Sequence, residues 1–332
     1  MRTEALRALV VVSVLATGCG QMHDMCPAPG PGCTPAADVE AELVRILAIE
    51  VGRAFDAERL AALARHEAPV VRRWAVRAVG RLRDPRGIPI VHAALEDPDP
   101  EVRAEAAFAA GLLRDTAATG LIERLAARGL LEALAENDVA RIAAAARVRL
   151  GRIRPEEAVV GDVALPLQAP PRDDAFYAAV VRRLVLPDLA GGRKPRVRVH
   201  TTAGSFVIEL APADAPLTVH NFLELARRGY FDGLRWHRVV PNFVIQGGDP
   251  TGTGSGGPGY AIRDEVNRIR FARGVVGMAL SGPDTGGSQF FVTHSPQPHL
   301  DGDFTIFGRV VEGMDVVDRI VQDDWIEKIE IS

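Results

Sequence analysis

Residues 236–249 read WHRVVPNFVIQGGD and are the most informative stretch of this 332-residue chain. Alternating apolar and polar residues over 236–240 and 243–246 predict two short strands. Working outward, similar runs predict six more strands and two helices. The strands are expected over 196–200, 205–210, 274–280, 289–293, 304–310 and 325–331, and the helices over 215–228 and 314–322. This content predicts a closed eight-stranded antiparallel β-barrel with helices covering its ends.

Three further blocks accompany this stretch: GMA at 277–279 followed by GGSQFF at 286–291, LDG at 300–302, and FG at 307–308. In this order and spacing they resemble the signature of the cyclophilins, the peptidyl-prolyl cis-trans isomerases, and the resemblance covers residues 194–332. It implies a cyclophilin barrel that isomerises Xaa-Pro bonds of exported or flexible polypeptides and assists their folding. It implies no cofactor and no metal.

The resemblance also implies roles for individual residues. Arg238 falls on the catalytic arginine, Gln246 on the glutamine that binds the substrate backbone, and Phe243 on a wall of the proline pocket. His299 stands where the best-known members have Trp, and Phe304 where they have His. The implied substrate-binding residues are Met278, Ala279, Leu280, Gln289, Phe291, His299, Leu300 and Phe304.

The chemistry of prolyl isomerisation explains why an arginine suits it. Rotation about the peptide bond breaks amide resonance, which sets a barrier of about 18–20 kcal/mol. The prolyl nitrogen accepts hydrogen bonds poorly while its lone pair is delocalised, and well once the amide is twisted. A donor aimed at that nitrogen therefore stabilises the transition state more than the ground state. The guanidinium is always protonated and only donates, which favours Arg238 for this task.

Two neighbouring features invite other readings. His237 could be taken for a general base, but isomerisation transfers no proton, so a packing role is predicted. The glycine-rich residues 251–259 lack the Gly-Lys-Ser/Thr ending of a phosphate-binding loop, and a surface loop is predicted instead. A non-catalytic adaptor that only holds Pro-containing segments is the alternative function.

Composition limits the other classes of function. The chain has 39 basic and 43 acidic residues and a net charge of −4, so nucleic acid is not expected as a partner. The apolar fraction of 47% excludes a disordered protein. No apolar run approaches the roughly 20 residues of a membrane span. The length predicts two domains.

An internal repeat lies ahead of the barrel. Val71, Ala75, Ala78, Gly80 and Asp84 recur 31 residues later as Val102, Ala106, Ala109, Gly111 and Asp115. Each unit predicts a helix with small residues where another helix approaches, then an aspartate that caps a second helix. The pattern resembles short HEAT-like repeats, with flanking helical pairs over 38–67 and 137–153. Such a stack implies a surface for a protein partner of unknown identity, and a plain helical bundle is the weaker alternative.

The first residues have the character of an export signal. A basic start is followed by an apolar stretch over 8–17, and LATGC at 15–19 resembles the lipobox of bacterial lipoproteins. This resemblance implies cleavage before Cys19 and acylation of its thiol, with an ordinary cleaved signal as the alternative. Gly20 and Gln21 then favour the periplasmic face of the outer membrane over that of the inner membrane. Cys26 and Cys33 could close a small disulfide loop in an oxidising compartment.

These observations divide the chain into five segments. They are a signal peptide at 1–18, a Pro/Gly-rich tether at 19–37, the HEAT-like repeats at 38–165, a linker with a short helix at 166–193, and the barrel at 194–332. The linker helix is expected around 173–185, either docking one domain on the other or closing the helical stack.

Overall fold

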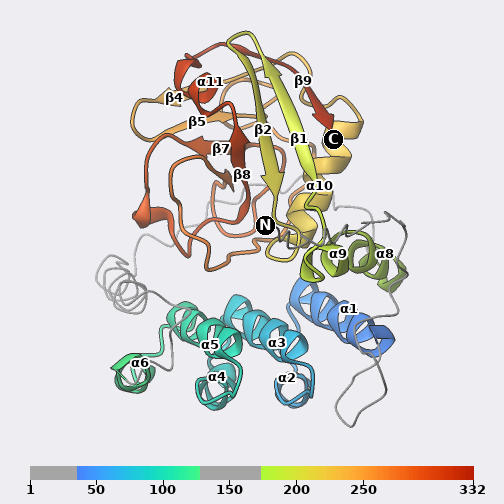
Figure 1. The fold of residues 1–332 in the computed structure, drawn as a ribbon, viewed down its shortest axis with the longest axis vertical. Helices are drawn as coiled ribbons and strands as arrows, with labels where there is room; N and C mark the ends of the chain where they lie inside the picture. Colours follow the sequence, from blue (N-terminus) through green and yellow to red (C-terminus); the bar gives the residue numbers. More distant parts are fainter. Residues whose placement is uncertain (1–35, 128–172) are drawn as a thin grey trace, which may run out of the picture.

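The computed structural model describes residues 36–127 and 173–332 (Figure 1). The predicted signal, tether, lipidated Cys19 and Cys26–Cys33 loop lie outside these residues, and so does the helical pair expected over 137–153. Among the helices that the structure does describe, none has both the length and the apolar character needed to cross a membrane.

The N-terminal half is a two-layer helical stack, as the repeat pattern predicts. Three helices, α1, α3 and α5, lie side by side in the layer that faces the barrel, while α2, α4 and α6 form the layer away from it (Figure 1). The bounds are α1 Ala36–Gly52, α2 Ala57–Leu63, α3 Pro69–Leu82, η1 Pro85–Gly87, α4 Ile88–Ala94, α5 Pro100–Leu112 and α6 Ala118–Ala127.

The repeated small residues act as expected, because they allow α3 and α5 to approach closely. A methyl group placed on Gly80 would lie 2.8 Å from the Cα of Ala109, which is in its turn a repeat position. Asp84 caps η1 by accepting a hydrogen bond from the Arg86 N–H, with Pro85 at the first helical position. Asp115 accepts from the Ala117 N–H ahead of α6 in the same way.

The C-terminal half is a curled antiparallel sheet. Within residues 196–331 it has nine strands in the order β3-β9-β1-β2-β8-β6-β7-β5-β4. Their bounds are β1 Arg196–Thr201, β2 Gly204–Leu210, β3 Leu234–Arg235, β4 Arg238–Val240, β5 Val244–Gly247, β6 Val275–Met278, β7 Phe290–Thr293, β8 Ile306–Glu312 and β9 Trp325–Ile331.

Nine strands replace the expected eight because the strand predicted over 236–240 belongs to a longer, bent segment. The fully buried Trp236 turns into the core and its backbone N–H donates to the carbonyl of Asp324, which separates β3 from β4. These two strands are the first and last in the sheet order, yet only Trp236 and His237 stand between them in the chain. The sheet therefore returns on itself through this bend.

Two helices cover the sheet, as predicted: α10 (Pro216–Arg227) and α11 (Met314–Arg319). Phe222 of α10 packs against three buried rings, with ring centroids 5.0–5.3 Å apart, and so joins the helix to the interior of the barrel. The three rings are those of Phe231, Phe290 and Phe307.

The linker helix both closes the helical stack and docks the stack on the barrel, the two roles between which the sequence did not decide. The segment α8 (Asp174–Val180), η2 (Val181–Val185) and α9 (Leu186–Leu189) packs on α1 and so closes the stack, and it also contacts α10 of the barrel domain (Figure 1). Tyr177 is buried in the core of the stack, and Leu217 of α10 joins that same core. Phe176 meets the ring of His220 at 5.0 Å.

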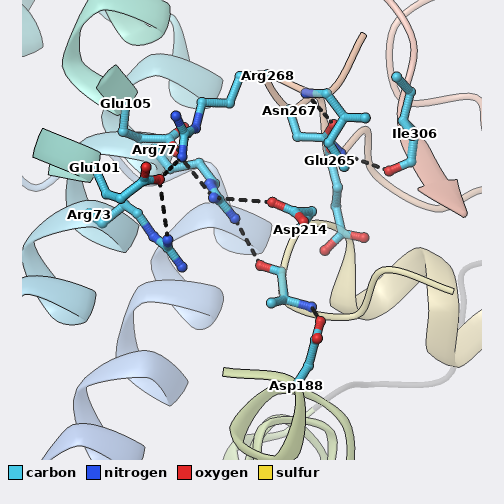
Figure 2. A network of polar contacts seen from close by, with 12 residues as sticks. Arg73, Arg77, Glu101, Glu105, Asp188, Asp214, Glu265, Asn267, Arg268 and Ile306 are labelled. Carbon is cyan, nitrogen blue, oxygen red and sulfur yellow. Dashed lines mark hydrogen bonds and ion pairs between the residues drawn. The ribbon is translucent and has the colours of Figure 1, made fainter. Parts of the chain in front are cut away.

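Arg77, on the inner face of α3, joins the two domains through a buried network (Figure 2). Its guanidinium donates to the carbonyl of Ala213 at 2.9 Å and to the carboxylate of Glu105 at 3.1 Å, and lies 3.4 Å from Asp214. The side chains of Arg77 and Glu105 are 3% and 0% exposed. Burial opposes the charge on Arg77, but Glu105 and Asp214 outweigh it and raise its pKa.

Arg81, one helical turn further along α3, makes a second set of contacts between the domains. Its guanidinium donates to the carbonyls of Val266, Asp214 and Glu265 at 2.8–3.1 Å and forms an ion pair with Glu50 of α1 at 2.9 Å. Buried charges are stable only when they are paired and hydrogen-bonded, and here they are. The two arginines therefore fix the barrel on the repeats in one orientation.

Candidate active site

A row of residues across four neighbouring strands builds the candidate site. Arg238 of β4 lies opposite Gln246 of β5, Gln246 opposite Phe291 of β7, and Phe291 opposite Gly277 of β6. Residues paired in register share one face of a sheet, so antiparallel pairing alone brings these four positions together. We call them the site row.

Arg238 is exposed and held by two contacts. Its Nη1 donates to the side-chain oxygen of Gln246 at 3.2 Å, and its guanidinium carbon lies 5.4 Å from the ring centroid of Phe243. The cation–π contact and the hydrogen bond together restrict the Arg238 guanidinium, and its other N–H donors can still face a ligand.

Gln246 is itself held by a chain of amide contacts. Its Nε2 donates to the side-chain oxygen of Gln289 at 3.0 Å, and Gln289 in turn donates to the carbonyls of Gly254 and Gly256 at 2.9 and 2.8 Å. The glycine-rich loop, which the sequence predicts only as a surface loop, therefore positions the two glutamines beside Arg238.

Asp249 anchors that loop. Its carboxylate accepts hydrogen bonds from the Thr251 N–H at 2.7 Å and the Gly254 N–H at 2.5 Å. Burial alone would raise the pKa of Asp249, but these hydrogen bonds outweigh it and lower the pKa. The carboxylate is thus ionised and structural, a role that the sequence analysis did not assign to it.

An apolar cluster lies on the same face as the site row. Phe291 packs against Phe271 with rings stacked at 5.5 Å and meets the edge of Phe304 at 5.8 Å. Phe243 stacks on the exposed His299 at 5.6 Å. Buried members of the cluster are Val244, Phe271, Val275, Phe291, Leu300 and Ile306, and partly buried ones include Phe243, Ala279 and Phe304.

Met278 does not join this cluster, contrary to the role that the resemblance implies for it. It is 2% exposed and belongs to the core inside the barrel. Successive side chains of a strand point to opposite faces, so when Gly277 faces Phe291, Met278 has to face inward. The position that matters on the site face is Gly277, where an added methyl would lie 2.5 Å from the Phe291 ring. The alternation of side chains along residues 275–278 could have placed Gly277, and not Met278, on the site face from the sequence alone.

Gly277→Ala is expected to damage the site while leaving the barrel folded. The methyl collides with Phe291 and Phe271, both of which are confined by their neighbours, and overpacking of this kind destabilises by about 1–3 kcal/mol. The displaced Phe291 ring should raise KM for an Xaa-Pro peptide. Steady-state kinetics and thermal melting check this, with Gly257→Ala as the control because Gly257 is exposed and has open space around it. Unchanged kinetics in Gly277→Ala would show that Phe291 plays no part.

The remaining predicted residues lie around the site row. Backbone N–H of Ala279 donates to the carbonyl of Gln289 at 3.0 Å, so the chain leaving β6 runs beside the amide contacts. Leu280 is half-buried where this strand ends. His237 has no hydrogen-bond partner for either ring nitrogen within the described part of the chain, and desolvation lowers its pKa. The packing role that the sequence analysis predicts for His237 fits this half-buried position.

Comparisons with known proteins agree with this geometry. The family model "Cyclophilin type peptidyl-prolyl cis-trans isomerase/CLD" matches residues 196–330, and a model of HEAT repeats matches residues 57–150. The chain is 49% identical over 134 residues to peptidyl-prolyl cis-trans isomerase CYP18-2 of Arabidopsis thaliana, a match that covers 39% of this chain and 82% of that protein. It is 48% identical over 138 residues to a peptidyl-prolyl cis-trans isomerase of Helicobacter pylori, covering 40% of this chain and 85% of that protein.

Among solved structures, a cyclophilin type peptidyl-prolyl cis-trans isomerase of Cryptosporidium parvum is similar at 34% identity with a TM-score of 0.40, over 42% of this chain and 98% of that one. Relatives about half identical over most of their own length decide the family. The chain belongs to the cyclophilin-type peptidyl-prolyl cis-trans isomerases, and HEAT repeats precede its isomerase domain.

Proposed function

We propose that Arg238 is the catalytic residue of this isomerase and acts as a hydrogen-bond donor to the prolyl nitrogen. The observation that carries the proposal is an exposed guanidinium held between Gln246 and the ring of Phe243, beside an apolar cluster. In the twisted amide the nitrogen lone pair is localised, so a donor already in place favours that state. Because Arg238 and the glutamines are held before substrate arrives, little reorganisation opposes catalysis.

The apolar cluster is proposed to receive the prolyl ring. Phe243, Phe291 and Leu300 present aromatic and aliphatic carbon next to Arg238, and burial of a prolyl ring against such a surface stabilises the complex by roughly 2 kcal/mol. Gln246 is proposed to hydrogen-bond the substrate backbone. The backbone of Ala279 and Leu280 is proposed to hold the residues that precede the proline.

The direct test is the rate of cis-to-trans conversion of an Ala-Pro peptide in the presence of the purified chain, measured by exchange NMR. We expect acceleration that scales with protein concentration. A protein that binds the peptide but does not change the exchange rate would instead fit the alternative, an adaptor that only holds Pro-containing segments.

The HEAT repeats are proposed to hold a protein partner. Their outer layer, α2 and α4, carries an open cavity of about 600 Å³ on the side away from the barrel, lined by side chains that include Arg65, His66 and Pro89. A partner bound there would leave Arg238 accessible, because Arg77 and Arg81 fix the inner layer on the barrel. The Xaa-Pro bonds of polypeptides would then be isomerised close to that partner.

We further propose that the protein is a lipoprotein at the periplasmic face of a bacterial outer membrane. The support is the sequence alone: a basic start, an apolar stretch, and a lipobox-like ending at Cys19. Several acyl chains on one residue would anchor the protein firmly, since each buried methylene contributes about 0.8 kcal/mol.

Cys19→Ala is expected to remove the lipid from the protein. Without the thiol there is no acceptor for the acyl chains, so metabolic labelling with a fatty acid should be lost. Cys26→Ala serves as the control and should keep both the label and the membrane association. Labelling that persists in Cys19→Ala would contradict the proposed anchor.

A further inference from the structure

A cavity of about 350 Å³ lies between the HEAT repeats and the barrel and adjoins the candidate active site. The barrel lines it with Leu280 and Phe304, both of them residues of the candidate site, and with Gly282 and Pro283, which follow Leu280. Phe304 also meets the edge of Phe291 in the site row. The cavity therefore continues the substrate-binding surface beyond Leu280 toward the repeats.

The repeats supply the opposite wall, chiefly with arginines at the ends of their inner helices. Arg53 follows α1 and Arg83 follows α3, and both adopt left-handed backbone conformations, with φ of 50° and 54°. Arg114 adopts the same conformation (φ 55°) one repeat later, but it is not part of the cavity lining.

The charged groups of the lining are four arginines and three aspartates, and most of them already have partners. Arg81 is held by Glu50 and by backbone carbonyls, and Arg53 pairs with Asp284. Asp264 and Asp284 each accept a hydrogen bond from the other's backbone N–H, which joins the two loops that carry them. These hydrogen bonds hold the barrel side of the cavity together. Oδ1 of Asp264 has no hydrogen-bond partner among the described residues, and burial raises the pKa of Asp264 to about 6.

Arg83 and Arg263 are different. Within residues 36–127 and 173–332, neither forms an ion pair with a carboxylate. Nη2 of Arg263 donates to the carbonyl of Arg81 at 3.4 Å, but its buried Nη1 has no hydrogen-bond partner among these residues. Partial desolvation between the domains lowers the pKa of both arginines. Arg83 is exposed, so an anion entering the cavity could reach it directly. A carboxylate placed there could accept charge-assisted hydrogen bonds from Arg83 and from the unpartnered Nη1 of Arg263.

We propose that this interdomain cavity binds an acidic side chain of the substrate polypeptide, carried by a residue that precedes the isomerised proline. The inference rests on the proposed function, in which the backbone of Ala279 and Leu280 holds the residues before the proline. The repeats then act as more than a scaffold: through Arg83 they select which Xaa-Pro bonds the barrel acts on. The ligand is a peptide glutamate or aspartate.

The test uses the full chain and a series of peptides that share an Ala-Pro core. One member has no charge, and the others carry Glu or Gln at a single position two to five residues before the proline. For one of these positions we expect the wild type to prefer Glu over Gln by about tenfold in kcat/KM, mainly through KM. The preference should shrink as salt is added, because exposed charges are screened.

Arg83→Gln should abolish the preference for Glu while leaving the rate on the uncharged peptide unchanged. Arg263→Gln should reduce the preference. Arg45→Gln removes an exposed arginine of α1 that pairs with Glu42 and is not in the cavity lining, and it should retain the preference in full. Thermal melting of each variant checks that it is folded. A wild type that isomerises every peptide with no preference for Glu, or an Arg83→Gln variant that keeps the preference, overturns this inference. A wild type inactive on all peptides, the uncharged one included, overturns the proposed function instead.

Discussion

Arg238→Ala is expected to lower kcat/KM for an Xaa-Pro peptide by about 10²–10³, the usual cost of removing one preorganised donor at a transition state. The side chain is exposed. Among the described residues it has a hydrogen bond with Gln246 and a cation–π contact with Phe243, both only partly buried, so its loss leaves no buried charge unpaired. The melting temperature should therefore stay close to that of the wild type. The effect should fall on kcat more than on KM, because the donor acts on the twisted amide and not on the planar one.

Arg235→Ala provides a matched control for this experiment. Arg235 is an exposed arginine on the preceding strand, and its guanidinium lies 4.8 Å from the ring centroid of Trp325, away from the site row. Its removal should leave the kinetics unchanged. Arg238→Lys keeps the charge but loses the planar fork, and we expect it to recover only part of the activity. If Arg238→Ala retained most of the wild-type rate, a donor other than Arg238 would have to act at the prolyl nitrogen.

Arg77→Ala is expected to cause the largest loss of stability, about 3–5 kcal/mol, which is typical when one partner of a buried ion pair is removed. The substitution leaves Arg268 as the remaining ion-pair partner of the fully buried Glu105 within the described residues, with Arg73 acting on it only through its charge, and it removes the donor to the Ala213 carbonyl. At present the pKa of Glu105 is lowered overall: burial would raise it, but Arg77 and Arg268 outweigh that effect. Chemical denaturation measures the loss.

Two further variants separate the charge effect from the simple loss of packing. Replacing both partners, as Arg77→Met with Glu105→Leu, removes the uncompensated charge and should recover much of the stability lost in Arg77→Ala. Arg86→Ala breaks an exposed pair with Asp84 and should change the denaturation midpoint little. An Arg77→Ala protein as stable as the wild type would mean that the network does not hold the two domains together.

The helices of the repeats and the strands of the barrel could be predicted from the sequence because each follows from the spacing of apolar and small residues along the chain. The offset of 31 residues marked Gly80 and Ala109 as positions of the small-residue repeat, and the structure shows that they lie against each other. Seven of the eight predicted strands overlap single observed strands closely, and the eighth, over 236–240, proved to be the end of a bent segment with β3 ahead of it. The two-residue strand β3 is too short to leave a pattern.

Which residues form the site could be predicted less completely, because this depends on the face of the sheet on which each side chain lies. Arg238, Gln246 and Phe291 meet as expected because register pairs them directly. Met278 was expected beside them, but alternation along β6 turns it into the barrel and brings Gly277 to the site face. A glycine carries no chemistry of its own, so its importance becomes visible only when the neighbouring Phe291 ring is in place.

By itself, then, the sequence determined the two kinds of domain and their order, because periodicity, turn residues and short motifs are local properties of the chain. Only the tertiary structure decided how the domains meet. Arg77 and Arg81 look like ordinary surface charges of an amphipathic helix, and their partners near Ala213 and Val266 lie more than a hundred residues away. No spacing rule links such distant positions; they are brought together by the burial of charges that must find hydrogen-bond partners. The cavity between the domains, with Arg83 and Arg263 in its walls, exists only because of that contact.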